Sequence, residues 1–294
     1  MEKPSFSSAQ TIGALLREAA VVLHDSGSSR LDAEVLLAHV LGVNRTGLLV
    51  RLRDQCTSEE VRAFSELVSR RAQGEPVAYI VGEREFYGMQ FRVNPAVLIP
   101  RPESELLIDE ALRCVGDRTS LSVLDLGTGS GCLSVVLAKK LRSAGVGAAI
   151  LAVDSSEDAL VVAAQNAKRH GVEGAIEFVK SDWYSAIDST SSRFDLIVAN
   201  PPYVDVTEPL QNDLLFEPSQ ALFSEDGGLR DTMRIVEGAE KFLNPSGVML
   251  CEVGADKTER LSELLKKYHD SFEVSFLGNA EDLDRFLVVR LQRR

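Results

Sequence analysis

The 294-residue sequence has few cysteines, no long apolar run and no excess of positive charge. None of its four cysteines belongs to a CxxC pair, and its four histidines show no ligand spacing, so we expect neither disulfides nor a metal site. The apolar stretches Ala19–Leu23 and Ala148–Val153 are far shorter than the roughly 20 residues of a membrane span. The first ten residues also lack the apolar core of a signal peptide. We therefore expect a cytoplasmic protein without membrane contact.

Basic residues are outnumbered by acidic ones. The chain carries 32 Lys and Arg against 44 Asp and Glu, a net charge of −12. Residues 101–294 account for −11 of this charge, with 21 basic and 32 acidic side chains, whereas residues 1–100 account for −1, with 11 and 12. Broad, phosphate-driven binding of nucleic acid needs clustered Lys and Arg. We therefore expect no direct nucleic-acid contact. The length suggests two domains or one large one.

The first 75 residues show helical periodicity. Apolar residues recur at helical spacing over residues 12–23 and form one stripe. Asp32 is expected to cap a second helix, with Gly42 just past its end. Thr57-Ser-Glu-Glu60 has the pattern of a capping box before a third helix. The pattern predicts a small all-helical domain over residues 1–75.

The remaining residues change to strand patterns and then to an alternation of strands and helices. Aromatic and β-branched residues broken by glycines predict a β-hairpin linker over residues 76–100. Helices are expected at 132–141 and 157–169, and strands at 121–126, 149–154, 176–179, 194–199, 248–253, 274–277 and 286–291. Such alternation predicts an α/β domain over residues 101–294 with a mostly parallel, Rossmann-like sheet of seven strands and helices on both faces. Ligands of such sheets bind outside the carboxyl ends of the strands.

A glycine loop lies between the strand at 121–126 and the helix that follows. In Asp125-Leu-Gly-Thr-Gly-Ser-Gly131 the glycines let the backbone approach a ligand, and the helix N-terminus favours an anionic group. The spacing departs from the dinucleotide pattern G-x-G-x-x-G, whose third glycine is replaced here by Cys132. Asp154, at the end of the second strand, is placed to accept hydrogen bonds from ribose hydroxyls; Asp125 is expected to attract the cofactor's amino group. The combination resembles class I S-adenosylmethionine-dependent methyltransferases; a nicotinamide enzyme or a purely structural turn stays open.

A second motif, Asn200-Pro-Pro-Tyr203, lies at the carboxyl end of the strand 194–199. Its two prolines stiffen the backbone and remove two N–H donors, which leaves the Asn200 side-chain oxygen and the carbonyls of Asn200 and Pro201 as acceptors. Such acceptors suit a planar –NH₂ group. Holding both hydrogens draws the lone pair back onto nitrogen, so positioning supplies much of the catalysis. Tyr203 adds an aromatic face. We therefore assign catalysis and substrate binding to Asn200, Pro201, Pro202 and Tyr203.

With both motifs in place, the chain resembles the HemK-type release-factor glutamine methyltransferases nearly end to end. The tetrad alone is shared with adenine-amino methyltransferases, whereas Pro-Arg-Pro-Glu upstream of the glycine loop, preceded by a helical domain, is specific to this family. The segments that carry the resemblance are Ile99–Glu105, Asp125–Gly131, Asp154, Ser181–Trp183, Asn200–Tyr203, Glu217–Leu222 and Glu252–Gly254.

The resemblance implies S-adenosyl-L-methionine as the cofactor. It implies that the substrate is the glutamine of a Gly-Gly-Gln motif in class I peptide-chain release factors, methylated on its side-chain amide nitrogen. The helical domain would help to grip the release factor, and we expect a monomer. The resemblance places Asp154 at the ribose and Trp183 beside the adenine. The residues that it assigns to the cofactor are Gly127, Thr128, Gly129, Ser130, Gly131, Asp154, Trp183 and Asn200.

The chain departs from the family pattern at three places. Ser104 replaces the usual Thr, Ala255-Asp-Lys257 stands where Gln is frequent, and Asp282-Leu-Asp-Arg285 replaces Gly-Arg-Asp-Arg. Residues 204–227 are either a solvated loop or a substrate-covering lid. Arginines of the helical domain form either a solvated face or a docking surface: Arg45, Arg51, Arg53, Arg62, Arg70 and Arg71.

Two other functions stay open. An adenine-amino methyltransferase that acts on a flipped base fits the tetrad chemically, although the −11 charge of residues 101–294 counts against it. A non-catalytic cofactor-binding protein that docks a partner is also conceivable. The intact tetrad counts against it.

Overall fold

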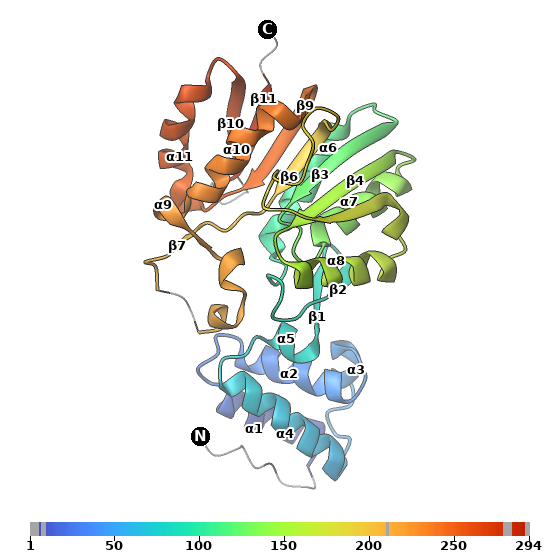
Figure 1. The fold of residues 1–294 in the computed structure, drawn as a ribbon. Helices are drawn as coiled ribbons and strands as arrows, with labels where there is room; N and C mark the ends of the chain where they lie inside the picture. The colour runs from blue at the N-terminus through green and yellow to red at the C-terminus, as the bar shows by residue number, and fades with distance from the viewer. Residues whose placement is uncertain (1–5, 7–9, 210–211, 279–283, 292–294) are drawn as a thin grey trace. The chain divides into compact units, whose positions relative to one another are not determined.

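The computed structural model describes residues 6, 10–209, 212–278 and 284–291 of the chain (Figure 1). The chain divides into two compact units. The first comprises Met1–Glu83 with Leu210–Phe216, and the second comprises Arg84–Pro209 with Glu217–Arg294.

The first unit is built from helices around one apolar core. Its helices are α1 (Ile12–Val22), α2 (Ser29–Val40), α3 (Arg45–Leu49), α4 (Ser58–Ala72) and α5 (Val77–Val81). Leu15, Leu36 and Phe64 are fully buried at its centre. The predicted capping box is confirmed, because Thr57 accepts from the Glu60 backbone N–H while the Glu60 carboxylate accepts from the Thr57 N–H. Gly42, just past α2, has the expected positive φ of 62°.

Asp32 does not cap α2, contrary to the sequence prediction. The helix begins at Ser29, so Asp32 lies in its first turn and points inward, where it is 6% exposed. Its carboxylate accepts from Arg71 Nε at 2.7 Å and from Ser28 Oγ at 2.7 Å. The Asp32 carboxylate pairs with Arg71, which is 39 residues away, and so it does not accept from the backbone N–H groups at the start of α2.

Most arginines of this unit are neutralised within it. Arg71 pairs with Asp32 as described, Arg30 and Arg45 both pair with Glu34, Arg51 pairs with Asp54, and Arg70 pairs with Glu75. The exposed pair Arg51–Asp54 contributes little to stability, but all of these pairs remove net charge from the surface. Arg53 and Arg62 are exposed and lie outside these pairs.

The hairpin is shorter than the predicted 76–100 segment. Residues 77–81 form helix α5, and the two strands are β1 (Glu83–Phe86) and β2 (Met89–Arg92). Tyr87 and Gly88 between them both have positive φ, the conformation of a two-residue hairpin turn. Tyr87 accepts this strained position because its hydroxyl donates to Asp109 at 2.6 Å and its backbone N–H donates to Glu105 at 2.8 Å.

The second unit contains the predicted seven-stranded sheet, in the order β10-β11-β9-β6-β3-β4-β5. Only β11 runs antiparallel to its neighbours. The chain passes from β3 outward to β5 and then returns to β6 on the other side of β3, which creates a switch point beside β3. The strands are β3 (Ser120–Leu126), β4 (Gly147–Asp154), β5 (Ile176–Lys180), β6 (Phe194–Ala199), β9 (Leu243–Glu252), β10 (Phe272–Gly278) and β11 (Asp284–Leu291).

Helices cover both faces of the sheet, and side chains of each strand alternate between two cores. On β3, Val123 packs with α6 (Glu105–Val115), α7 (Cys132–Ser143) and α8 (Glu157–Arg169). Leu124 faces the opposite way and packs with α10 (Arg230–Phe242) and α11 (Thr258–Leu265). This period of two is the signature of a sheet buried on both faces. It holds the carboxyl ends of β3, β4 and β6 rigidly at one edge.

The described residues of the segment 204–227, which are 204–209 and 212–227, contain several short elements. These are β7 (Val204–Asp205), two short 3₁₀ turns (Leu214–Phe216 and Ser219–Ala221), β8 (Phe223–Ser224) and the start of α9 (Glu225–Gly228). The atypical Lys257 lies against this segment, with its Nζ 2.8 Å from a Glu208 carboxylate oxygen. The other atypical position, Asp282, lies outside the described residues.

Within the ranges that the structure describes, no helix is long and apolar enough to cross a bilayer. The same residues contain no cluster of His, Cys, Asp and Glu suited to a metal ion.

Candidate active site

The glycine loop folds over the end of β4. The backbone N–H groups of Gly127 and Thr128 both donate to the Val153 carbonyl at 2.9 Å. Gly127, Gly129 and Gly131 all have positive φ, between 54° and 77°, a region that favours glycine. The loop therefore needs glycine at all three positions for its backbone path.

The surroundings of the three glycines differ. A Cβ on Gly127 would lie 3.2 Å from the Trp183 ring, and one on Gly131 would lie 3.0 Å from Ala163 Cβ of α8. A Cβ on Gly129 would meet nothing within 4 Å. Gly129 therefore borders open space, whereas Gly131 allows α8 to pack closely.

Asp125 holds the loop together from beneath. It is fully buried, and one carboxylate oxygen accepts from Thr128 Oγ1 at 2.8 Å and from Ser134 Oγ at 2.6 Å. Burial raises the pKa of Asp125 to about 6, although both hydroxyl donors act in the opposite direction. The side chain does not line the pocket described below. In this structure it shapes the loop from within the core, and its expected role toward the cofactor's amino group stays a prediction.

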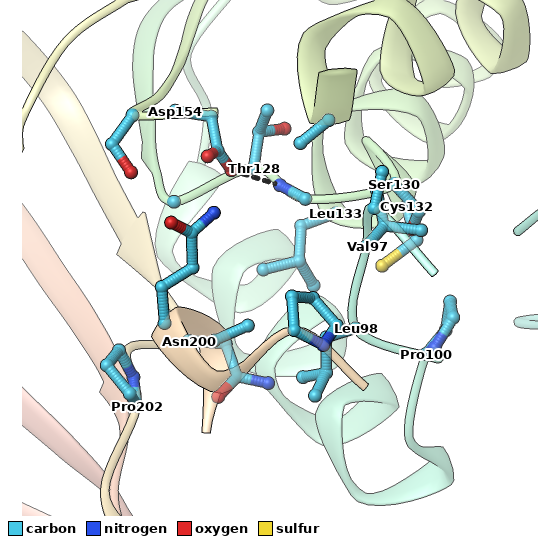
Figure 2. A pocket seen from close by; sticks show the side chains of 18 of the residues that line it. Val97, Leu98, Pro100, Thr128, Ser130, Cys132, Leu133, Asp154, Asn200 and Pro202 are labelled. Atoms are coloured by element: carbon cyan, nitrogen blue, oxygen red, sulfur yellow. Dashed lines mark hydrogen bonds between the residues drawn. The ribbon is translucent and has the colours of Figure 1, made fainter. Parts of the chain in front are cut away.

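A single pocket brings together most of the predicted site residues. Asp154 and Thr128 lie at one end and Asn200 and Pro202 at the other (Figure 2). Gly127, Gly129, Ser130 and Trp183 also line it, whereas Gly131, Pro201 and Tyr203 do not. The pocket opens at the carboxyl ends of β3, β4 and β6, where the strand order predicts a ligand.

Asp154 ends β4 and is fixed by the backbone around it. One carboxylate oxygen accepts from the Gly129 N–H at 2.9 Å and the other from the Ser156 N–H at 2.9 Å. Burial raises the pKa of Asp154, and these backbone donors oppose the shift. Each oxygen keeps a further lone pair, so the carboxylate can accept hydrogen bonds from a diol in the pocket.

Trp183 forms one wall in an unusual backbone conformation. Its φ is 49°, and its ring lies over Gly127. The indole Nε1 donates to Asp231 Oδ1 at 3.0 Å, and the other Asp231 oxygen accepts from Ser224 Oγ at 2.7 Å. Asp231 of α10 therefore fixes the ring. This residue lines the pocket, and the sequence prediction missed it because no local pattern marks it.

Asn200 is oriented by a hydroxyl behind it. Its Nδ2 donates to Ser104 Oγ at 3.1 Å, so Oδ1 is the end of the carboxamide available to a ligand. Pro201 and Pro202 are buried. Tyr203 is half-buried, and burial raises its pKa to about 12. A Cβ on Gly228 would lie 2.1 Å from the Tyr203 carbonyl, so the tetrad backbone is fixed by close packing.

The sequence prediction also missed the wall built by residues 97–104 and 218–221. The first segment lines the pocket with Val97, Leu98, Pro100 and Arg101, and the second lines it with Pro218, Gln220 and Ala221. Glu217 joins the two segments: its buried carboxylate accepts from the Ile99 N–H at 2.9 Å and from Arg101 Nη2 at 2.5 Å. Glu217 is therefore not a solvated loop residue. Both segments are among those that carry the family resemblance, and this resemblance is the sequence signal from which the wall could have been predicted.

The pocket fits an adenosine-type cofactor in three respects. Open space borders Gly129, where a Cβ would intrude. Asp154 offers acceptors suited to ribose hydroxyls, and Trp183 offers a flat face suited to a base. These features of the pocket favour the binding of a nucleoside, with its base against the apolar wall.

Comparison with known proteins identifies both parts of the chain. Residues 14–82 match the PrmC N-terminal domain family, and residues 117–284 match a methyltransferase domain family. Among solved structures, the hMettl16 catalytic domain superposes with a TM-score of 0.54 at 17% identity, over 77% of this chain and 82% of that one. At this identity the likeness concerns the fold alone.

Relatives named release factor glutamine methyltransferase are similar along most of the chain. The one from Burkholderia pseudomallei is 41% identical over 84% of this chain and 87% of its own. The one from Escherichia coli is 39% identical over 87% of this chain and 91% of its own. The one from Nitratidesulfovibrio vulgaris is 38% identical over 98% and 97%. Similarity of this extent covers the helical unit as well as the sheet that carries the pocket, and so the chain belongs to the release factor glutamine methyltransferase family, whose cofactor is S-adenosylmethionine.

Proposed function

We propose that this protein methylates the side-chain amide nitrogen of the glutamine in the Gly-Gly-Gln motif of class I peptide-chain release factors. The observation that carries the proposal is the orientation of Asn200. Its donor end is held by Ser104, and its Oδ1 acceptor is left for a ligand, in the same pocket as the glycine loop. A glutamine –NH₂ group needs acceptors, and this end of the pocket offers them.

The tetrad acts by positioning. An amide nitrogen is a poor nucleophile because its lone pair is delocalised into the carbonyl. We infer that Asn200 Oδ1 and the neighbouring backbone carbonyls hold both amide hydrogens, which favours a lone pair localised on nitrogen. S-adenosylmethionine, when bound, supplies an activated methyl group. The stiff proline backbone keeps the acceptors in place without reorganisation, which is the efficient form of electrostatic catalysis.

The cofactor end of the pocket is assigned to residues 127–131, Asp154 and Trp183. Asp154 would accept from the ribose hydroxyls, and the Trp183 ring would stack beside the adenine. Asn200 would lie at the boundary between cofactor and substrate. Gly131 contributes indirectly, because it lets α8 support the loop.

We further propose that the helical unit docks the release factor. Its arginines are mostly paired, but Val50 is 79% exposed and Leu52 is 38% exposed next to Arg53. Exposed apolar side chains beside an arginine are typical of contact surfaces. The free thiols of all four cysteines suit the cytoplasm as the place of action.

The first experiment tests the substrate. The protein is incubated with cofactor carrying a labelled methyl group and a release factor, either unchanged or with the Gly-Gly-Gln glutamine replaced by alanine. We expect label only in the unchanged factor, and mass spectrometry of the Gly-Gly-Gln peptide should show one added methyl group. Equal label in both factors would contradict the substrate assignment.

A pair of variants tests the site. Asn200→Ala should keep cofactor binding and lose methyl transfer, because it removes an acceptor and leaves the glycine loop intact. Asp154→Ala should instead weaken cofactor binding, and methyl transfer should fall because less cofactor is bound. Binding can be followed by fluorescence of Trp183, the single tryptophan of the chain. Unchanged turnover in Asn200→Ala would refute the role of the tetrad.

A further inference from the structure

A chain of buried hydrogen bonds continues behind Asn200. Asn200 Nδ2 donates to Ser104 Oγ at 3.1 Å, and Ser104 Oγ donates to Glu252 Oε2 at 2.5 Å. Ser104 is 3% exposed and Glu252 is 1% exposed. Asn200 follows β6, Glu252 ends the neighbouring strand β9, and Ser104 ends a 3₁₀ turn before α6. Three distant parts of the sequence therefore meet behind the substrate end of the pocket.

The order of donors along this series of hydrogen bonds decides which way the Asn200 carboxamide faces. A hydroxyl has one hydrogen, and Ser104 gives it to the Glu252 carboxylate, which can only accept. Ser104 is then left with acceptor lone pairs, so Asn200 must turn its Nδ2 toward Ser104. We propose that Ser104 and Glu252 are positioning residues that hold Asn200 with its Oδ1 acceptor toward the substrate amide. This inference rests on the proposed function.

Protonation of Glu252 would remove the constraint. A carboxylic acid can donate to Ser104 Oγ, and the hydroxyl can then donate to Asn200 Oδ1. The carboxamide would flip and present its –NH₂ end to the pocket. Two –NH₂ groups cannot hydrogen-bond to one another through their hydrogens, so the substrate amide would lose an acceptor. The orientation of Asn200 is therefore coupled to the charge of Glu252.

The surroundings of Glu252 make its charge sensitive to pH. Burial raises the pKa of Glu252 to about 7, and its Oε1 has no hydrogen-bond partner among the residues that the structure describes. Arg285 of β11 and Arg101 favour the ionised form, and Glu103 opposes it. The remaining titratable neighbours, which Glu252 affects in turn, are Tyr203, Cys132 and Cys251.

The experiment measures kcat and KM for the release factor against pH in the wild type, Glu252→Gln, Ser104→Ala and Ser104→Thr. In the wild type we expect kcat to rise with pH through an inflection near the pKa of Glu252 and then level off. Glu252→Gln should lose this inflection. Ser104→Ala should lower kcat about three- to tenfold, the effect of one orienting hydrogen bond, with cofactor affinity unchanged. Ser104→Thr keeps the hydroxyl and should recover most of this loss.

A matched control lies near the amino ends of the central strands β3, β6 and β9, away from the carboxyl ends that form the pocket. Asp195 accepts from Ser122 Oγ at 3.0 Å and from Asn244 Nδ2 at 2.8 Å, an arrangement of the same three residue classes away from the pocket. Asp195→Asn and Ser122→Ala should leave the pH profile as in the wild type. They show what the loss of a partly buried hydrogen bond outside the pocket does by itself.

A spectroscopic readout keeps the inference independent of turnover. With ¹⁵N-labelled asparagine, the Asn200 side-chain amide signal should shift with pH in the wild type, with the midpoint of the kinetic inflection, and should not shift in Glu252→Gln. An inflection that persists in Glu252→Gln, or full kcat in Ser104→Ala, would overturn the inference. If the wild type does not methylate the release factor, the proposed function fails, and the Asn200 signal still decides whether the chain of hydrogen bonds sets the orientation.

Discussion

Replacement of Gly131 by alanine gives a quantitative test of how the glycine loop is built. The residue has a φ of 77°, and a left-handed conformation costs a residue with a Cβ about 1–2 kcal/mol. The new Cβ would also lie 3.0 Å from Ala163 Cβ and 3.1 Å from Ala163 Cα. Overpacking of this kind costs about 1–3 kcal/mol. Gly131→Ala should therefore lower the free energy of unfolding of the second unit by about 2–5 kcal/mol.

Urea unfolding without cofactor measures this change. Trp183 lies in the second unit beside the loop, so its fluorescence reports the unfolding of that unit. The added variant Ala163→Gly removes the facing Cβ, although helix α8 loses about 1 kcal/mol by the change alone. Because Ala163 Cα stays close, we expect Gly131→Ala/Ala163→Gly to be less destabilised than the sum of the two variants by about 1 kcal/mol.

Gly129→Ala provides the comparison. Its φ is 54°, so the conformational cost is similar, about 1–2 kcal/mol, but its Cβ would meet nothing within 4 Å. It should destabilise the unit less than Gly131→Ala and weaken cofactor binding more, because the Cβ enters the pocket. Additive effects of Gly131→Ala and Ala163→Gly, or equal destabilisation by the two glycine variants, would refute the packing argument.

Three further predictions concern charged groups. Asp154→Ala should weaken cofactor binding about 10- to 100-fold, the effect of lost hydrogen bonds to a charged acceptor, and unchanged affinity in a fluorescence titration would contradict its role. Asp32→Ala should destabilise the helical unit by about 3 kcal/mol, because the largely buried Arg71 guanidinium loses its carboxylate partner and keeps only its bonds to the Gly74 and Glu75 carbonyls; thermal unfolding followed by circular dichroism should show a lower melting temperature, with cofactor affinity unchanged. Burial raises the pKa of Asp125 to about 6 from 3.8, so its stabilising contribution is full below about pH 3.8 and is lost as pH rises through 6. The free energy of unfolding of Asp125→Asn minus that of the wild type should therefore rise by about 1 kcal/mol from pH 5 to pH 8. A difference that does not change with pH would rule out the raised pKa of Asp125.

Local patterns predicted the elements whose signals lie within their own sequence. The strand at 194–199 and the helix at 157–169 were predicted with the observed bounds, because each combines a clear apolar pattern with a recognisable boundary. The N-cap Ser156 accepts from the Ala159 N–H, which fixes the start of α8. Helices α6, α10 and α11 were not predicted. Their apolar residues do recur at helical spacing, as Ile235, Val236, Ala239 and Phe242 of α10 show, so the signal was present.

Pairings between distant residues could not be predicted from local patterns. Asp32 fits the pattern of an N-cap, and only Arg71 in the folded unit shows why it lies inside the helix instead. Glu217 has the character of a loop carboxylate in the sequence, yet it is buried against Ile99 and Arg101. In both cases a carboxylate is used at a site that the fold creates, where burial requires a partner. Local composition carries no information about that partner.

The glycine loop shows the same distinction within one motif. A sequence match treats Gly127, Gly129 and Gly131 as equivalent, and their shared positive φ supports this at the level of the backbone. Their neighbours separate them: Gly127 makes room for the wall formed by Trp183, Gly131 makes room for α8, and Gly129 alone borders open space. Each of the three glycines is therefore needed for a different physical reason. At Gly129 an added Cβ would enter the pocket, whereas at Gly127 and Gly131 it would first meet Trp183 or α8, so a loss of cofactor binding there should be relieved by changes in these packing partners.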